Sequence, residues 1–230
     1  MKEFDRKEVA RVLGVDIRQA EFFQTAFTHR SYLNEHRNYP LDHNERLEFL
    51  GDAVLELVVT EYLFHHYPNP EGELTSWRAA LVNGEMLARV GAEIGIEPFL
   101  MMSRGESKDT GRSRQYLVAN AMEAIIGALY LDQGYDAARD FILRVIVSHL
   151  PEVFEQKLYA DPKSEFQEQA QTRLGMTPSY RVLSESGPDH DKCFTAGAYV
   201  GDDLVAEGTG NSKQEAQRDA AKNALKKKGW

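Results

Sequence analysis

Residues 117–131 constrain the fold more than any other part of the chain, because this stretch is apolar on almost every side. A helix of that composition is normally buried among other elements. Apolar residues recur at helical spacing on both sides of it, in residues 9–13, 22–27, 47–63, 79–90 and 137–147. The pattern predicts an all-α domain over residues 1–151, with residues 117–131 in its interior.

Two polar residues, Asn120 and Glu123, interrupt this apolar stretch three positions apart. Residues three apart in a helix lie on neighbouring parts of one surface. A buried, ionised glutamate needs a cation or hydrogen-bond donors around it. A core arginine and a metal ion would both meet that need, and the pattern alone leaves the two alternatives open.

The sequence changes character after residue 151. Residues 152–160 are polar and lie between Pro151 and Pro162, which predicts a linker. Then follow a helical pattern at 164–174, strand patterns at 179–184 and 193–200, and a short strand ending at Ala206. Ser212 and Glu215 form a capping-box pattern that opens a last helix, to about residue 227. Residues 161–230 therefore form a separate α-β-β-β-α domain, and the whole fold is mainly α.

The charge is acidic, with a formal net charge of -9 and a pI near 5.3. Taken alone, this argues against nucleic-acid binding, because phosphate contacts need Lys and Arg. From Asp161 onward, ten Lys and Arg nearly balance eleven Asp and Glu, whereas the preceding part has 17 against 25. The acidic part would repel RNA, or it would concentrate carboxylates that bind cations, and composition does not choose between these.

Composition also bears on the compartment. Cys193 is the single cysteine and cannot form an internal disulfide, which fits the reducing cytoplasm. The chain has no run of about 18 apolar residues that would cross a membrane. Residues 1–11 are charged and lack the apolar stretch of a signal peptide.

Residues 44–55 place three acids on one helical face. Glu45, Glu48 and Asp52 fall within an arc of roughly 60° at about 100° per residue. The opposite face is centred on apolar residues, namely Leu47, Leu50, Val54 and Leu57. Such a face is either solvated or cation-binding; like charges at this spacing cost roughly 0.2–0.5 kcal/mol per pair unless a cation intervenes. Gly51 costs about 1 kcal/mol inside a helix, which close approach of another backbone or ordinary tight packing would explain.

Carboxylate and amide oxygens suit a hard cation such as Mg²⁺ or Mn²⁺. The seven histidines are scattered and form no zinc-type spacing with the one cysteine. The Glu-x-x-His pair of di-iron helix bundles is also absent from the sequence.

With these segments in view, the chain resembles the bacterial ribonuclease III family over nearly its whole length. Residues 44–55 resemble the family signature, and residues 119–132 its second acidic motif. Shorter matches are Thr28-His29-Arg30-Ser31 and Glu71-Gly72-Glu73-Leu74. The order of domains is also similar: a helical nuclease domain followed by a double-stranded-RNA-binding domain.

The resemblance implies a homodimeric endoribonuclease that cuts double-stranded RNA by metal-assisted hydrolysis. It implies that Glu48, Asp52 and Glu123 bind Mg²⁺, with Mn²⁺ as a substitute, and that Asp52 and Glu123 act on the attacking water. Asn120 is a further ligand, although many family members have Asp there; an uncharged ligand predicts weaker metal affinity. The implied products carry 5′-phosphate and 3′-hydroxyl ends with short 3′ overhangs, in the processing of ribosomal RNA precursors and messenger RNA.

The resemblance assigns three more residues of the nuclease domain. Glu45 and Glu71 match further family acids, which support RNA or a second metal. Phe49 corresponds to a position at the dimer interface; the alternative is an ordinary core phenylalanine.

In the second domain, Gln167, Glu168 and Gln171 are expected to reach 2′-hydroxyls in the RNA minor groove. His190 is expected to enter the next minor groove. Residues 208–213 lead into a helix N-terminus suited to phosphate. The family often has three lysines there, in a Lys-Lys-x-Ala-Lys cluster, but this chain has Lys213, Gln214 and Gln217. We therefore expect weaker RNA binding and a shallower salt dependence.

Two other interpretations remain. The chain would be a binding protein if it gripped duplex RNA without cutting it, which loss of the metal carboxylates would favour. An acidic helical interaction domain with a small appended module fits the composition, but it leaves residues 119–132 unexplained.

Overall fold

The computed structural model describes residues 4–108, 111–159, 161–187 and 192–230. It divides into two compact units, Met1–Tyr159 and Ala160–Trp230. Within the described residues, no helix is long and apolar enough to cross a membrane.

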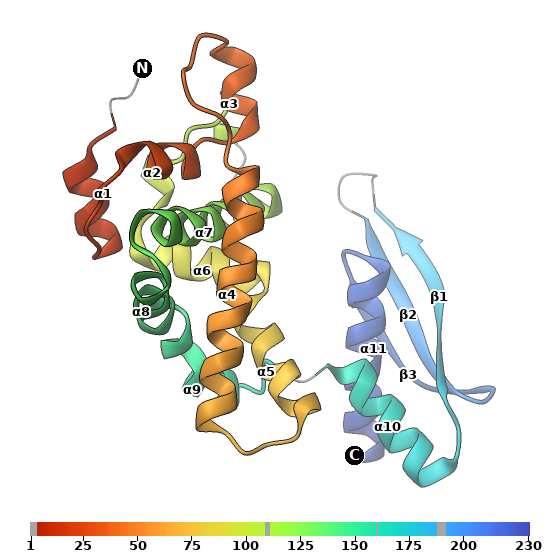
Figure 1. The fold of residues 1–230 in the computed structure, drawn as a ribbon. Coiled ribbons are helices and arrows are strands. Elements are labelled where there is room, and N and C mark those ends of the chain that lie inside the picture. The colour runs from red at the N-terminus through yellow and green to blue at the C-terminus, as the bar shows by residue number, and fades with distance from the viewer. Residues whose placement is uncertain (1–3, 109–110, 160, 188–191) are drawn as a thin grey trace. The chain divides into compact units, whose positions relative to one another are not determined.

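The first unit is helical (Figure 1), which confirms the predicted all-α fold. Three short 3-10 turns, Glu97–Phe99, Glu106–Lys108 and Val147–His149, complete the α-helices. The α-helices are α1 (Arg6–Leu13), α2 (Ala20–Ala26), α3 (Arg30–Glu35), α4 (Glu45–His66), α5 (Glu71–Val82), α6 (Gly84–Ile94), α7 (Arg112–Gln133), α8 (Tyr135–Val145) and α9 (Leu150–Glu155).

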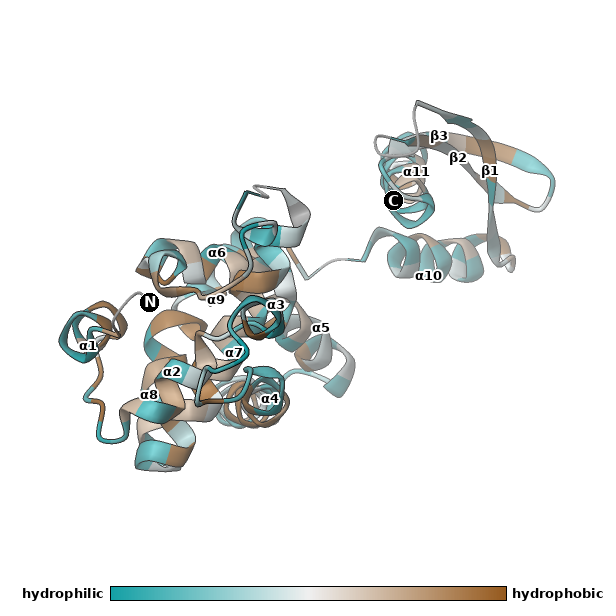
Figure 2. Ribbon diagram, turned by 90° about the horizontal axis from the view of Figure 1, so that it is seen from above, coloured by the Kyte–Doolittle hydropathy of each residue, from teal (hydrophilic) through white to brown (hydrophobic). Residues whose placement is uncertain are grey.

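Helix α7 lies in the interior of this unit, as its apolar sequence predicts. It packs against α2, α4, α6 and α8. Met122, Ile125, Ile126 and Leu129 are completely buried. In Figure 2, hydrophobic and hydrophilic residues alternate around the surrounding helices, as expected of amphipathic helices that cover a core.

The backbones of α4 and α7 touch where they cross. A Cβ atom added to Gly51 would lie 1.8 Å from the carbonyl oxygen of Glu123. A Cβ atom added to Gly127 would lie 2.3 Å from the carbonyl oxygen of Leu47. Glycine is therefore required on both helices by close backbone approach, which decides between the two explanations for Gly51.

Some local predictions were wrong. Residues 79–90 do not form one helix: α5 ends at Val82 and α6 begins at Gly84, because Asn83 accepts the N–H of Met86 and caps α6. Leu57 was expected on the buried face of α4, yet 57% of it is exposed. Helix α3 was not expected as a separate element.

The segment expected to be a linker, residues 152–160, begins inside α9. Val153 is completely buried in the core of the first unit. The Phe154 ring packs edge-on against Trp77, with ring centroids 4.7 Å apart. This burial holds α9 in the first unit, so the predicted linker is shorter than residues 152–160.

The second unit has the predicted α-β-β-β-α order (Figure 1). Its elements are α10 (Pro162–Leu174), β1 (Pro178–Ser186), β2 (Cys193–Val200), β3 (Asp203–Gly210) and α11 (Lys213–Lys228). The strands form one antiparallel sheet in the order β1-β2-β3. Phe166 and Ala170 of α10 are buried with alanines of α11.

Strand β3 continues to Gly210, beyond the predicted end at Ala206. A Cβ atom at Gly208 would lie 2.0 Å from the backbone nitrogen of Ala220 in α11. The glycine thus lets helix and strand backbones meet. The predicted cap of α11 is present, since the Ser212 hydroxyl accepts the N–H of Glu215 at 3.1 Å.

Candidate active site

The crossing of α4 and α7 gathers the predicted acidic residues. On α4, Glu48 and Asp52 lie on either side of the crossing glycine, Gly51. On α7, the carbonyl of Glu123 lies against that same glycine. No side chain separates the two backbones at this point. The acids of α4 and the acid of α7 beside the crossing therefore lie in one region.

Two acids of this cluster have raised pKa values. Burial, with repulsion from Asp52 and Glu48, raises the pKa of Glu123 to about 7. Burial, with repulsion from Glu45 and Asp52, also raises the pKa of Glu48. A hydrogen bond with Asn120 has the opposite effect on the pKa of Glu48. The cluster therefore concentrates negative charge that is only partly solvated.

The donor set fits a hard divalent cation. Oε2 of Glu48 is buried and has no hydrogen-bond partner in the described part of the chain. A buried carboxylate oxygen of this kind is stabilised by a cation. The other donors are carboxylate oxygens and the amide of Asn120, which are ligands that Mg²⁺ and Mn²⁺ accept.

The side chains are not already arranged as a completed metal cage. Among the described residues, no three Asp, Glu, His or Cys side chains stand together as ready ligands. The helix crossing fixes the positions of the two backbones. For the acids to share one ion, their side chains would have to adopt other rotamers.

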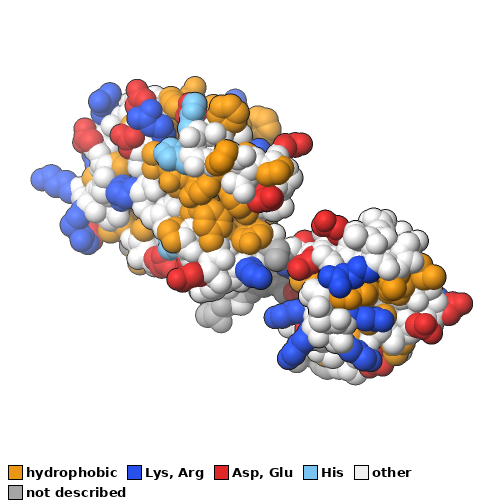
Figure 3. Space-filling view, turned by 90° about the horizontal axis from the view of Figure 1, so that it is seen from below, with side chains coloured by type: hydrophobic (Ala, Val, Ile, Leu, Met, Phe, Trp, Pro, Cys, Tyr) orange, Lys and Arg blue, Asp and Glu red, His pale blue; other side chains and the backbone are white. Residues whose placement is uncertain are grey.

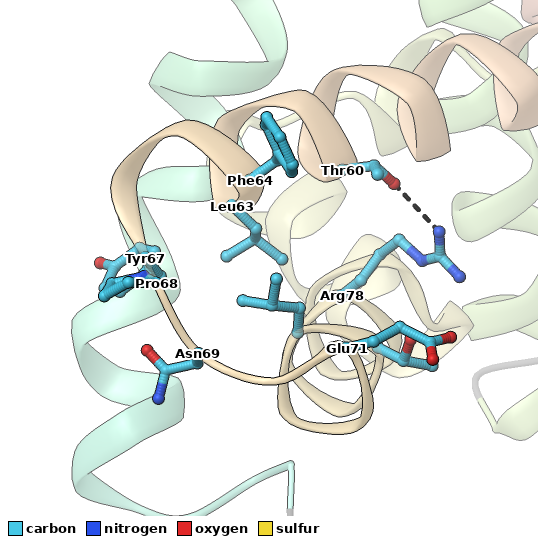
Figure 4. A pocket seen from close by; sticks show the side chains of 10 residues that line it. Thr60, Leu63, Phe64, Tyr67, Pro68, Asn69, Glu71 and Arg78 are labelled. Carbon is cyan, nitrogen blue, oxygen red and sulfur yellow. Dashed lines mark hydrogen bonds between the residues drawn. The ribbon is translucent and has the colours of Figure 1, made fainter.

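The two supporting acids lie in different places. Glu45 begins α4, is exposed, and lies 3.4 Å from a guanidinium nitrogen of Arg30. Glu71 begins α5 and lines a pocket of about 570 Å³ beside the C-terminal end of α4, near Phe64 (Figure 4). At about 1.5 Å per residue, Phe64 lies roughly 24 Å along α4 from Glu48. Within one chain, Glu71 is therefore not part of the acidic cluster.

The segment Thr28-His29-Arg30-Ser31 joins the start of α4 to residues 101–103. The carbonyl of Thr28 accepts the N–H of Asn44, at 2.9 Å, directly before α4. The N–H of His29 donates to the carbonyl of Met101, at 2.8 Å. The Ser31 hydroxyl oxygen accepts the N–H of Ser103, at 3.0 Å. This segment therefore fixes the backbone where the acidic helix begins.

The His29 ring is part of the same network. Its Nδ1 accepts the N–H of Ser31 at 3.3 Å and lies 2.8 Å from the Ser31 hydroxyl. Burial lowers the pKa of His29, whereas nearby Glu106 acts in the opposite direction. Sequence reasoning singled out this motif but not its contacts, because its partners lie up to 72 positions away.

Helix α4 exposes a row of large apolar side chains. The exposed fractions are 82% for Phe49, 57% for Leu57 and 71% for Phe64. Phe49 is therefore not a core phenylalanine of this chain. Figure 3 shows a face of the first unit on which hydrophobic side chains gather. Surfaces of this kind mark interaction sites in many proteins.

Another buried acid outside this cluster has a structural role. The carboxylate of Asp132, at the end of α7, accepts the N–H groups of Arg18 and Gln19 at 2.8 and 2.7 Å. These groups directly precede α2, so Asp132 ties that helix to α7. Asp132 belongs to the second acidic motif, but its backbone contacts, rather than a cation, account for its burial.

In the second unit, the predicted RNA-contacting side chains of α10 are exposed: Gln167, Glu168 and Gln171. On α11, Lys213 and Gln214 are also exposed. Lys213 lies 3.2 Å from the carboxylate of Glu185. His190 lies outside the described residues.

Gln217 is partly buried, and its side-chain oxygen accepts a hydrogen bond from the Lys163 ammonium at 2.9 Å. Sequence reasoning did not single out Lys163, which lies 54 positions away.

Two family models match the chain, one for each unit. The first, described as "Ribonuclease-III-like", matches residues 19–150. The second, "Double-stranded RNA binding motif", matches residues 162–228.

Curated relatives match over nearly the full length. Ribonuclease 3 of Pelotomaculum thermopropionicum is 44% identical over 216 residues, which cover 94% of this chain and 90% of the relative. Ribonuclease 3 of Carboxydothermus hydrogenoformans is 45% identical over 217 residues, which cover 94% of this chain and 92% of the relative. Among solved structures, the nuclease domain of ribonuclease III from Campylobacter jejuni is 37% identical, with a TM-score of 0.57; the match covers 66% of this chain and 98% of that one.

Proposed function

Because the chain belongs to the ribonuclease III family and is a double-stranded-RNA-specific endoribonuclease, we propose that it cuts RNA with Mg²⁺ held between α4 and α7. The proposed ligands are Glu48, Asp52, Asn120 and Glu123, with Mn²⁺ as an alternative ion. The observation that carries this proposal is the crossing at Gly51, which brings carboxylates from two helices into one partly buried, repelling cluster.

Each ligand has a distinct role in this proposal. When bound, the metal would lower the pKa of a water molecule and stabilise negative charge on the scissile phosphate. Glu48 offers a buried oxygen that has no hydrogen-bond partner among the described residues. Asn120, whose side chain acts to lower the pKa of Glu48, adds a neutral oxygen. Asp52 and Glu123 accept hydrogen bonds from the attacking water and hold it in position.

The product chemistry follows from the direction of attack. Water attacks phosphorus in line with the bond to the 3′ oxygen, so the 3′ oxygen leaves as a hydroxyl and the phosphate stays on the 5′ end. Short 3′ overhangs, and action on precursors of ribosomal RNA and on messenger RNA in the cytoplasm, are supported by family likeness. We propose a nuclease domain that extends through α9 to residue 159 and an RNA-binding domain from residue 160, so the linker is shorter than the predicted 152–160.

We further propose a homodimer formed by antiparallel packing of α4 on α4. In a twofold interface, residue i faces residue j and residue j faces residue i. The midpoint between Phe49 and Phe64 falls next to Leu57. A twofold axis near Leu57 would therefore place Phe49 of each copy opposite Phe64 of the other. Phe49 of one copy would then reach the 570 Å³ pocket beside Phe64 of the other.

The same twofold arrangement gives Glu71 a function. Glu71 lines the pocket that would receive Phe49 of the other copy. Phe49 is adjacent in sequence to Glu48, so the interface would bring Glu71 toward the acidic cluster of the opposite copy. This supports its role as an acid that assists the site, together with Glu45.

The second unit binds double-stranded RNA. We propose that Gln167, Glu168 and Gln171 contact one minor groove and that His190 contacts the next. The start of α11, with Lys213, Gln214 and Gln217, would contact the phosphates between the two grooves. The exposure of the three α10 side chains supports this arrangement.

The test is incubation with a plain RNA duplex and Mg²⁺. We expect the wild-type chain to produce short products with 5′-phosphate ends. Glu123→Gln should bind the duplex without cutting it. Glu56→Gln is the matched control, since it removes an exposed charge from α4 one turn beyond Asp52, and it should cut normally. Uncut RNA with the wild-type chain in both Mg²⁺ and Mn²⁺ would favour the binding-only alternative.

A further inference from the structure

The start of α11 is poor in charge for a surface that is expected to contact phosphate. Gln214 and Gln217 are uncharged, and Lys213 is the one cation among the three expected contacts. The Lys213 ammonium lies 3.2 Å from the carboxylate of Glu185, which offsets part of its charge. A phosphate on this surface would therefore need another cation nearby.

Lys163 of α10 places a cation at this position. Its Nζ donates to Oε1 of Gln217 at 2.9 Å, on the second turn of α11. The same ammonium lies over the Tyr180 ring, 4.7 Å from the ring centroid. These two contacts fix a long side chain that would otherwise be mobile, so its charge is held beside α11.

Lys163 also continues the expected RNA-contacting side of α10. Gln167 lies four residues later, and residues four apart lie one above the other on a helix. Asp161, the nearby acid, uses its carboxylate oxygens to accept from the Lys163 backbone N–H and the Ser164 hydroxyl. No ion pair between the Lys163 side chain and an acid is found in the part of the chain that the structure describes.

We propose that Lys163 supplies a phosphate-binding charge beside position 217 of α11, where this chain has an uncharged glutamine. This inference rests on the proposed phosphate-binding role of the start of α11. A cation that reaches across from α10 should make the salt dependence steeper than Lys213 alone would give.

The test measures binding of the full-length chain to an RNA duplex in EDTA, which prevents cutting, over a series of salt concentrations. Each phosphate contact contributes about 0.9 to the log–log slope. Lys163→Gln should therefore lower the slope by about 0.9. The ratio of the wild-type affinity to the Lys163→Gln affinity should therefore fall about 3.5-fold between 50 and 200 mM salt.

Two further variants separate charge from folding, and a third controls for the position of the charge. Lys163→Arg keeps the charge and should keep the wild-type slope. The double variant Lys163→Gln, Gln217→Lys moves the charge onto α11 and should restore the slope, although it lacks the Tyr180 contact. Lys227→Gln removes a charge about 15 Å further along α11 and should leave the slope unchanged.

An unchanged slope in Lys163→Gln, or failure of the double variant to restore it, would overturn the inference. Wild-type binding that does not respond to salt would overturn the proposed phosphate contact of α11 itself, and the inference with it. If Lys163→Gln weakens folding, the slopes of Lys163→Arg and the double variant decide the question.

Discussion

Replacing Gly51 with alanine should destabilise the first unit and abolish RNA cleavage together. The added Cβ would lie 1.8 Å from the carbonyl oxygen of Glu123, whereas real Cβ contacts essentially never fall below 3.0 Å. The Cβ is fixed directly to the backbone of α4 and the oxygen belongs to the backbone of α7, so neither can rotate away and the helices must separate by more than an ångström. Alanine gains about 1 kcal/mol in helix propensity, but overpacking of this kind costs typically 1–3 kcal/mol and occasionally more.

We expect Gly51→Ala to lower the free energy of unfolding by about 2 kcal/mol. For a unit of this size, that corresponds to a fall in Tm of roughly 4–8 °C. The assays are urea unfolding followed by circular dichroism, and cleavage of an RNA duplex at a temperature where the variant is folded. Cleavage should fail because separation of α4 from α7 moves Glu123 away from Asp52.

Gly72→Ala is the matched control. Gly72 lies in the first turn of α5, and a Cβ atom there would meet no heavy atom within 4 Å. This change should be neutral or stabilise the chain by up to about 1 kcal/mol, with normal cleavage. A Gly51→Ala chain as stable and active as the Gly72→Ala chain would refute the reasoning from the helix crossing.

Asp132→Ala should lower the free energy of unfolding by about 1–3 kcal/mol in urea titrations, because the N–H groups of Arg18 and Gln19 lose their acceptor; an unchanged midpoint would contradict this role. In metal-free chain, Glu123→Gln should raise the Tm at pH 8 but hardly at pH 5: the pKa of about 7 means that the native state binds an extra proton between about pH 4.5 and 7, so stability falls as pH rises through that window. Phe49→Asp should give monomers by analytical ultracentrifugation with circular dichroism unchanged, and a persistent dimer would exclude the proposed α4 interface.

Sequence periodicity predicted the fold well where the distribution of apolar residues around an element determines which side is buried. Residues 117–131 lack a polar side, so burial of α7 followed directly. The alternation of the second unit likewise predicted its sheet. Periodicity could not separate a core face from an exposed apolar face, and for this reason Leu57 was misplaced. It also missed the break at Asn83, because a single side chain caps α6 there.

The acids of the candidate site could be predicted from the sequence, but the contacts between distant segments that position its helices could not. Glu48 and Asp52 share a helical face, which spacing shows. Contacts between distant segments carry no such periodic signal: Ser31 accepts from Ser103 across 72 positions, and Lys163 reaches Gln217 across 54. Each of these depends on how complete elements pack, so the structure was required to find them.

Mn²⁺ binding to the RNA-free chain, followed by titration calorimetry, tests the central claim most directly. We expect Glu48→Gln to lower the affinity at least tenfold, whereas Glu56→Gln binds as the wild-type chain does. Equal affinities for the wild-type chain and Glu48→Gln would show that the carboxylates at the α4–α7 crossing do not hold the ion.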